Sequence, residues 1–77
     1  MYKIFLKVGL SGEPMDTGAG PLMCLEDARM YARGLADGIN GACSIEQRGR
    51  YVIDVQYIHG DYTETVYSAV GITGGKL

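Results

Sequence analysis

Apolar and polar residues alternate most regularly at the start of the chain, over residues 2–8. One side of a strand built from these residues carries Tyr2, Ile4, Leu6 and Val8, and the other side carries Lys3, Phe5 and Lys7. Because successive side chains of a strand point to opposite faces, the first set is expected to face the core. Phe5 is then left between two lysines on the opposite face.

A pattern with the helical period covers residues 25–38. Its apolar positions fall on one helical face: Leu25, Ala28, Ala32, Leu35, Ala36 and Ile39. Glu26 and Asp27 suit the first turn, where acidic side chains interact favourably with the helix dipole. Gly38 suits a left-handed cap and is expected to end the helix. Gly34, inside the helix, could let a strand approach closely because it carries no side chain.

Residues 42–47 and 50–58 are predicted to form a hairpin around Arg48-Gly49. A two-residue loop would pair polar with apolar positions, whereas the three-residue loop Gln47-Arg48-Gly49 aligns the apolar ones. The second register is preferred because it also places Gly49 at the left-handed bulge position of such loops. It produces one apolar face, made of Cys43, Ile45, Tyr51, Ile53, Val55 and Tyr57.

Glycine and proline divide the rest of the chain. Residues 9–20 hold four glycines and one proline, a composition that rules out a regular element and predicts a long loop. Residues 21–23 suit a short edge strand, since proline is tolerated there. A turn at residues 59–61 precedes a strand over residues 62–70, whose poor alternation does not identify its inward side. Residues 71–77 are expected to form a flexible tail.

This order of elements predicts an α+β fold, with one helix packed on one face of a small antiparallel sheet of three to five strands. The chain of 77 residues is expected to form one such domain, over residues 1–77. A helix of about four turns covers only one side of a sheet. The other side is expected to carry Phe5, Val52 and Ile58 with Lys3, Lys7, Asp54 and Gln56, and one row of the last strand that includes Tyr67.

Composition narrows the classes of function. Hydrophobic residues make up 47% and charged residues 21% of the chain, as in a folded globular protein. No apolar run approaches the roughly 18 residues of a membrane span, and the alternating N-terminus is unlike a signal peptide. Seven basic residues are spread among nine acidic ones, so the chain lacks the basic cluster that nucleic-acid binding needs. Direct binding to a membrane or to nucleic acid is therefore not expected.

One short motif matches a catalytic signature. Asp16-Thr17-Gly18-Ala19 resembles the active-site loop of aspartic proteases, in which two such loops share a proton. A chain of this length supplies one loop, so the enzyme would be a dimer. The neighbouring sequence lacks the apolar strand and the Gly-Arg pair of those enzymes. The alternative is a turn in which Asp16 forms a hydrogen bond with its own backbone.

Other candidates for chemistry are few. Cys24, near the start of the helix, is either a nucleophile or a partly buried thiol, and His59 is expected to be a turn residue. With two cysteines, no Cys-x-x-Cys motif and one histidine, neither a metal nor a cofactor is expected. Cys24 and Cys43 are expected to be reduced, mostly buried thiols of a cytoplasmic protein.

The layout of the central segments is similar to that of small phage-encoded inhibitors, in particular some anti-CRISPR proteins. The resembling stretches are LEDARMYA at 25–32, ACSIE at 42–46 and RGRYVI at 48–53, about half of the chain. In those proteins a short antiparallel sheet packs on one helix, and the domain blocks a host complex. The resemblance implies a non-enzymatic, stoichiometric mode of action and transfers no site residues.

A protein-binding module is therefore the first hypothesis, and an inhibitor of a host defence or nucleic-acid-processing complex is its most specific form. The expected partner-binding residues are four apolar anchors and four steering charges: Phe5, Val52, Ile58, Tyr67, Lys3, Lys7, Arg48 and Arg50. A homodimer formed through the uncovered face or an edge strand is the second hypothesis. An enzyme that uses Asp16 or Cys24 is the third.

Overall fold

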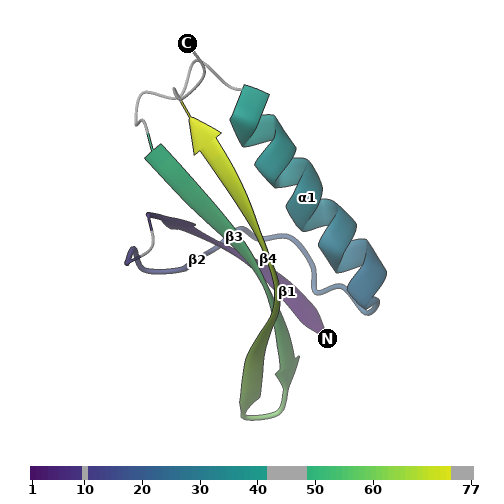
Figure 1. Cartoon of the computed structure of the whole chain (residues 1–77). Helices are drawn as coiled ribbons and strands as arrows, with labels where there is room; N and C mark the ends of the chain where they lie inside the picture. Colours follow the sequence, from purple (N-terminus) through teal and green to yellow (C-terminus); the bar gives the residue numbers. More distant parts are fainter. Residues whose placement is uncertain (10, 42–48, 74–77) are drawn as a thin grey trace.

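The computed structural model describes residues 1–9, 11–41 and 49–73 of the chain. Five elements follow one another: β1 (Tyr2–Val8), β2 (Met15–Asp16), α1 (Leu25–Gly41), β3 (Gly49–His59) and β4 (Tyr62–Thr73). The strands form an antiparallel sheet in the order β2-β1-β3-β4, and α1 lies along one face of it (Figure 1). The predicted α+β fold is therefore confirmed.

The register between β1 and the central strand β3 positions the core. Ile4 lies opposite Val55 and Leu6 lies opposite Ile53, so both strands turn these apolar residues toward α1. Ile4, Ile53 and Val55 are the largest side chains that are completely buried. The faces predicted for these two strands are confirmed, because strict alternation leaves a strand only two ways to orient its side chains.

Alanines form the buried side of α1. Three of them, spaced four residues apart, pack on the sheet: Ala28, Ala32 and Ala36. The helix continues to Gly41, so the predicted end at Gly38 is wrong. Beyond Gly38, Ile39 packs against the core and Asn40 Oδ1 accepts a hydrogen bond from the Ile72 N–H at 2.7 Å. These contacts with β4 outweigh the preference of Gly38 for a cap.

A glycine of β4 allows α1 to approach the sheet closely. A Cβ atom built on Gly71 would lie 2.8 Å from the Ile39 Cβ and 3.1 Å from the Ala36 carbonyl oxygen. A larger residue at this position would push the helix away. Gly34, by contrast, is exposed and has nothing within 4 Å of a built Cβ, so the predicted close approach at Gly34 is wrong.

β3 and β4 form a long hairpin whose turn lies at the opposite end of the molecule from the C-terminal end of α1 (Figure 1). His59 lies opposite Tyr62, and Gly60-Asp61 is the two-residue loop. Gly60 has a φ of 60°, as the first central residue of a tight hairpin loop requires. The predicted turn is confirmed. β4 continues to Thr73, so the start of the predicted tail belongs to the strand, and residues 74–77 lie outside the described ranges.

The segment before α1 differs from its prediction. The loop at 9–20 contains the short strand β2, which pairs with β1, so the expectation of no regular element there is wrong. The sequence predicts an edge strand at residues 21–23. They contribute a single bridge instead, in which the Leu22 and Tyr2 backbones exchange hydrogen bonds.

The hairpin predicted between residues 42–47 and β3 is also corrected. Residues 42–48 lie outside the described ranges. Within β3, however, both edges are already paired: Ile53 lies opposite Leu6 of β1 on one side and Ala69 of β4 on the other. A strand has only two hydrogen-bonding edges, so the predicted pairing of Cys43 with Ile53 is wrong.

A β-bulge changes which residues of β4 face α1. Val55 pairs with Tyr67 but Gln56 pairs with Thr65, so β4 contains one extra residue at this point. The alternation is therefore out of phase on the two sides of the bulge. The helix side of β4 carries Tyr62, Glu64, Tyr67, Ala69 and Gly71, and the other side carries Thr63, Thr65, Ser68, Val70 and Ile72. Tyr67 packs against the core, so its predicted place on the uncovered face is wrong.

Candidate functional site

The face of the sheet that α1 leaves uncovered, called the open face below, is formed by alternate residues of all four strands. They are Lys3, Phe5, Lys7, Asp16, Arg50, Val52, Asp54, Gln56, Ile58, Thr63, Thr65, Ser68, Val70 and Ile72. The helix lies on the other side of the sheet (Figure 1). The open face has a polar centre, with an apolar hollow toward the hairpin turn and an apolar strip toward the end of β4.

Asp54 is the centre of the open face and is only 5% exposed. Its carboxylate accepts a hydrogen bond from the Ser68 hydroxyl and lies 3.7 Å from the Lys7 ammonium nitrogen. A buried carboxylate without partners is strongly unfavourable, so these two neighbours are what keep the charge stable there. Nearby, Gln56 Nε2 donates a hydrogen bond of 2.6 Å to Thr65 Oγ1. The polar side chains at the centre of the face thus find their hydrogen-bond and ion-pair partners on adjacent strands.

The apolar hollow has a volume of about 310 Å³. Its lining comes from β1, the loop before β2 and the β3–β4 hairpin: Phe5, Pro14, Gln56, Ile58 and Thr63. Phe5 and Ile58 are half-buried, so part of each side chain stays available to a partner. The volume lies at the lower end of the roughly 300–1,000 Å³ of small-molecule pockets and is sufficient for one side chain of a protein partner.

The apolar strip consists of Val52, Val70 and Ile72. Val70 is 46% and Ile72 is 48% exposed. Val52 lies between Lys7 and Val70 in the sheet register and is nearly buried, so this predicted anchor offers little free surface. Arg50 is exposed and lies opposite Ile72. The strip therefore presents aliphatic surface beside a guanidinium group.

Two of the four cations that are expected to steer a partner are paired within the chain. Lys3 forms an ion pair with Asp16 at 2.7 Å, and Lys7 forms an ion pair with the buried Asp54. Arg50 has no acidic partner in the described part of the chain, and Arg48 lies outside it. Within the described ranges, the open face therefore offers a partner apolar surface with one unpaired cation rather than a positively charged patch.

The Asp16-Thr17-Gly18-Ala19 segment forms a turn beside β1. Asp16 Oδ1 accepts a hydrogen bond from the Gly18 N–H at 2.9 Å, and the Thr17 hydroxyl donates one of 2.8 Å to the Ile4 carbonyl. The hydrogen bond from Lys3, followed by the one from Gly18, holds the pKa of Asp16 below its usual value. The predicted turn, closed by Asp16 and its own backbone, is confirmed. Both carboxylate oxygens are engaged, one by Gly18 and one by Lys3.

The other candidates for chemistry lie apart from the open face. Cys24 is the N-cap residue of α1, since its carbonyl oxygen accepts the Ala28 N–H at 3.1 Å. Its thiol is exposed, so the expectation of a mostly buried thiol is wrong for Cys24, while Cys43 lies outside the described residues. His59 is exposed at the end of β3. Among the described residues, no group of three or more His, Cys, Asp and Glu side chains could hold a metal ion.

An aromatic cluster that the sequence did not reveal lies on the helix side of the sheet near the hairpin turn. The Tyr57 ring is at its centre, 5.3 Å from the ring of Tyr2 and 6.4 Å from the rings of His59 and Tyr62. The Tyr62 hydroxyl donates a 2.9 Å hydrogen bond to Glu64, and this bond together with the charge of Glu64 raises the pKa of Tyr62. These residues can be assigned to one face only when the register of the β3–β4 hairpin is known.

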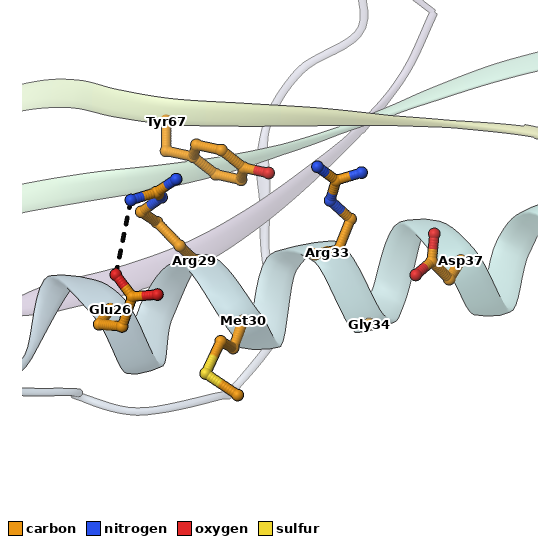
Figure 2. Close-up of a pocket in the computed structure, with 7 residues that line it drawn as sticks. All are labelled: Glu26, Arg29, Met30, Arg33, Gly34, Asp37 and Tyr67. Carbon is orange, nitrogen blue, oxygen red and sulfur yellow. Dashed lines mark hydrogen bonds and ion pairs between the residues drawn. The ribbon is translucent and has the colours of Figure 1, made fainter.

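A second hollow, called the helix groove below, lies between α1 and β4 (Figure 2). Its volume is about 370 Å³, and it is lined by Glu26, Arg29, Met30, Arg33, Gly34, Asp37 and Tyr67. The Arg29 guanidinium lies over the Tyr67 ring, 5.3 Å from the ring centroid, and is 3.5 Å from Glu26 Oε1. Tyr67 is therefore held between the core and Arg29, on the opposite side of the sheet from the hollow at Phe5.

No family model matches this chain, and neither a curated protein nor a solved structure matches it. Over the three described ranges, no helix is both long and apolar enough to cross a membrane. Function is therefore inferred from the surfaces of the chain itself. Of these, the open face combines accessible apolar side chains with a polar surround.

Proposed function

We propose that the chain is a non-enzymatic protein-binding module that holds a side chain of its partner in the apolar hollow of the open face. The observation that supports this most directly is the hollow between Phe5 and Ile58, two half-buried apolar residues on a face that no described element covers. Accessible apolar surface rimmed by polar groups is typical of protein–protein interfaces.

The surround of the hollow indicates what a partner must present. Gln56 and Thr63 place an amide and a hydroxyl group at its wall, so a partner with one large apolar side chain and neighbouring backbone groups can satisfy them. Arg50, near the apolar strip, has no acidic partner among the described residues and favours an acidic side chain at the far end of the contact. The similarity in layout to anti-CRISPR proteins makes a host defence complex the first partner to test.

A capture experiment with the tagged full chain tests the proposal. Phe5→Ala removes the aromatic wall of the hollow. Tyr31→Ala is the matched control, because it removes a side chain that is 45% exposed from α1, on the other side of the sheet. We expect the wild type and Tyr31→Ala to recover the same stoichiometric partner from an extract of the native host. We expect Phe5→Ala to bind that partner at least about 30-fold more weakly, as for a central anchor residue.

Two results contradict the proposal. One is the recovery of no stoichiometric partner by the wild type at micromolar concentration. The other is equal affinity of the wild type and Phe5→Ala for the isolated partner, which would place the contact elsewhere on the chain. Circular dichroism of both variants checks that the helix and the sheet are retained before affinities are compared.

A further inference from the structure

The outer edge of β4 is a second surface to consider, and no described strand pairs with it. β4 has 12 residues and is the last strand in the order β2-β1-β3-β4, so among the described residues it pairs with β3 along one edge only. The other edge presents backbone N–H and C=O groups, which another strand can bind.

Two hydrogen bonds of β3 show which backbone groups lie on the outer edge. The Ile58 N–H donates to the Met1 carbonyl, and the Gly9 N–H donates to the Arg50 carbonyl. The even-numbered residues of β3 therefore direct their backbone groups toward β1, and their partners on β4 direct theirs away from β3. On the stretch of β4 that follows the bulge, these outward partners are Ser68, Val70 and Ile72.

The fold caps one of these groups and leaves others free. Asn40, in the last turn of α1, accepts the Ile72 N–H at 2.7 Å. In the described parts of the chain, no hydrogen bond reaches the N–H of Ser68 or Val70. The open stretch of the edge therefore ends just before Ile72.

Features that normally protect an edge strand are scarce in β4. Its residues include one charged side chain, Glu64, and neither lysine nor proline. Val66 and Val70 are 37% and 46% exposed, so the edge is partly apolar. Natural sheets usually block a long edge with charges, prolines or a covering element. An edge without these features is suited to pairing with another strand.

The helix groove runs beside this edge. Asn40, which reaches the edge at Ile72, lies on the same flank of α1 as Arg33 and Arg29, seven and eleven residues earlier in the helix. The groove also contains Glu26 and Asp37, so its two arginines and two acids give it no net charge (Figure 2). The groove of a second copy can therefore lie opposite this one, with the arginines of each copy near the acids of the other. A partner with a strong charge of one sign would instead be repelled by either the arginines or the acids.

We infer that two copies of the chain pair antiparallel through their β4 edges and join two 4-stranded sheets into one continuous sheet. An antiparallel edge is self-complementary about a twofold axis, since the outward N–H groups that Asn40 does not cap, those of Ser68 and Val70, can each meet an outward C=O of the other copy. The two helices then lie on one side of the joined sheet. Both open faces lie on the other side, so the dimer presents two hollows. Formation of the dimer does not depend on the proposed function.

Val70→Pro tests the pairing. Proline removes the Val70 N–H, which has no acceptor within the described chain, and its ring obstructs a neighbouring strand, so the dimer is lost while the fold survives. Val70→Thr is the matched control, because it keeps the N–H and the β-branched shape. By light scattering from low to high micromolar concentration, the wild type and Val70→Thr are expected at twice 8.3 kDa, and Val70→Pro at 8.3 kDa.

A wild-type chain that stays at 8.3 kDa at every concentration overturns the inference, and so does a Val70→Pro chain that remains a dimer. If Val70→Pro does not fold, amide hydrogen exchange of the wild type replaces it. Pairing predicts that the amides of Ser68 and Val70 exchange more slowly as the concentration rises, and an unchanged rate contradicts it. Phe5→Ala is expected to remain a dimer, so loss of partner capture and loss of the dimer are separate results.

Discussion

The two faces of the sheet are both closed to solvent along the middle of β3, but by different means. On the helix side, Ile53 and Val55 are completely buried against the alanines of α1. On the open face, Val52 and Asp54 are only 7% and 5% exposed, although no described element lies above them. There Asp54 is contacted by side chains of the adjacent strands, Lys7 of β1 and Ser68 of β4.

This difference shows that burial of a strand residue does not require a second layer of structure. Long side chains of adjacent strands can cover a central position with their aliphatic parts and still leave a polar surface. The helix side is therefore held together by the volume of its apolar side chains, whereas the centre of the open face is held together by polar pairing. Near Phe5 and Ile58 this lateral cover is incomplete, and the hollow lies there.

The largest effect is expected on the helix side. Ile53→Ala leaves a cavity against α1 and is expected to lower the free energy of unfolding by about 2–5 kcal/mol, a large share of the stability of a small domain. Ile58→Ala, in the half-buried wall of the hollow, should cost clearly less. Urea denaturation followed by circular dichroism measures both. Equal losses at the two positions would remove the distinction between the faces.

A smaller effect is expected at the centre of the open face. Ser68→Ala removes the hydroxyl that donates to Asp54 and leaves part of a buried carboxylate without a partner, at a cost of about 1–3 kcal/mol. Thr63→Ala, at an exposed residue of the same strand, serves as the control and should change the stability by less than about 0.5 kcal/mol. If both substitutions had the same small effect, polar pairing would not be what stabilises this face.

The smallest effect is expected at the exposed ion pair beside β2. Because Lys3 and the Gly18 N–H lower the pKa of Asp16 in the folded chain, this carboxylate stabilises the fold above its ordinary pKa of 3.8. The contribution is lost as the pH falls from that value through the lower folded-state pKa. Lys3→Met should raise the pKa of Asp16, and carbon-detected NMR titration of the carboxyl group measures it. An unchanged pKa would show that the ion pair is not formed in solution.

The sequence was most informative where a strand alternates without interruption. Ile4, Ile53 and Val55 were assigned to the core, and Phe5 and Ile58 to the open face, from alternation alone. In β4 alternation does not identify the inward side, because the bulge inserts one residue and reverses the phase. The predicted place of Tyr67 on the open face is therefore wrong. Glycine marks some bulges in a sequence, but residues 62–70 contain none, so this bulge becomes evident only from the pairing of the two strands.

Contacts between distant parts of the chain were also beyond prediction. The hollow needs Pro14, whose loop is placed beside Phe5 by the pairing of β2 with β1. The end of α1 is set by Asn40 and its bond to Ile72 rather than by the cap residue at Gly38. In both cases the interaction that determines the structure joins residues of different elements, so a local sequence pattern does not reveal it.

The most direct test of the open face is the solvent accessibility of isoleucine methyl groups, measured by NMR with a soluble paramagnetic probe. Ile4 and Ile53 lie under α1, and Ile58 lies in the wall of the hollow. In the free chain, the methyl signals of Ile58 should broaden steeply as the probe is added, while those of Ile4 and Ile53 stay sharp. If the Ile58 signals stayed as sharp as those of Ile53, the hollow would already be covered by the chain itself, and the proposed binding surface would not exist.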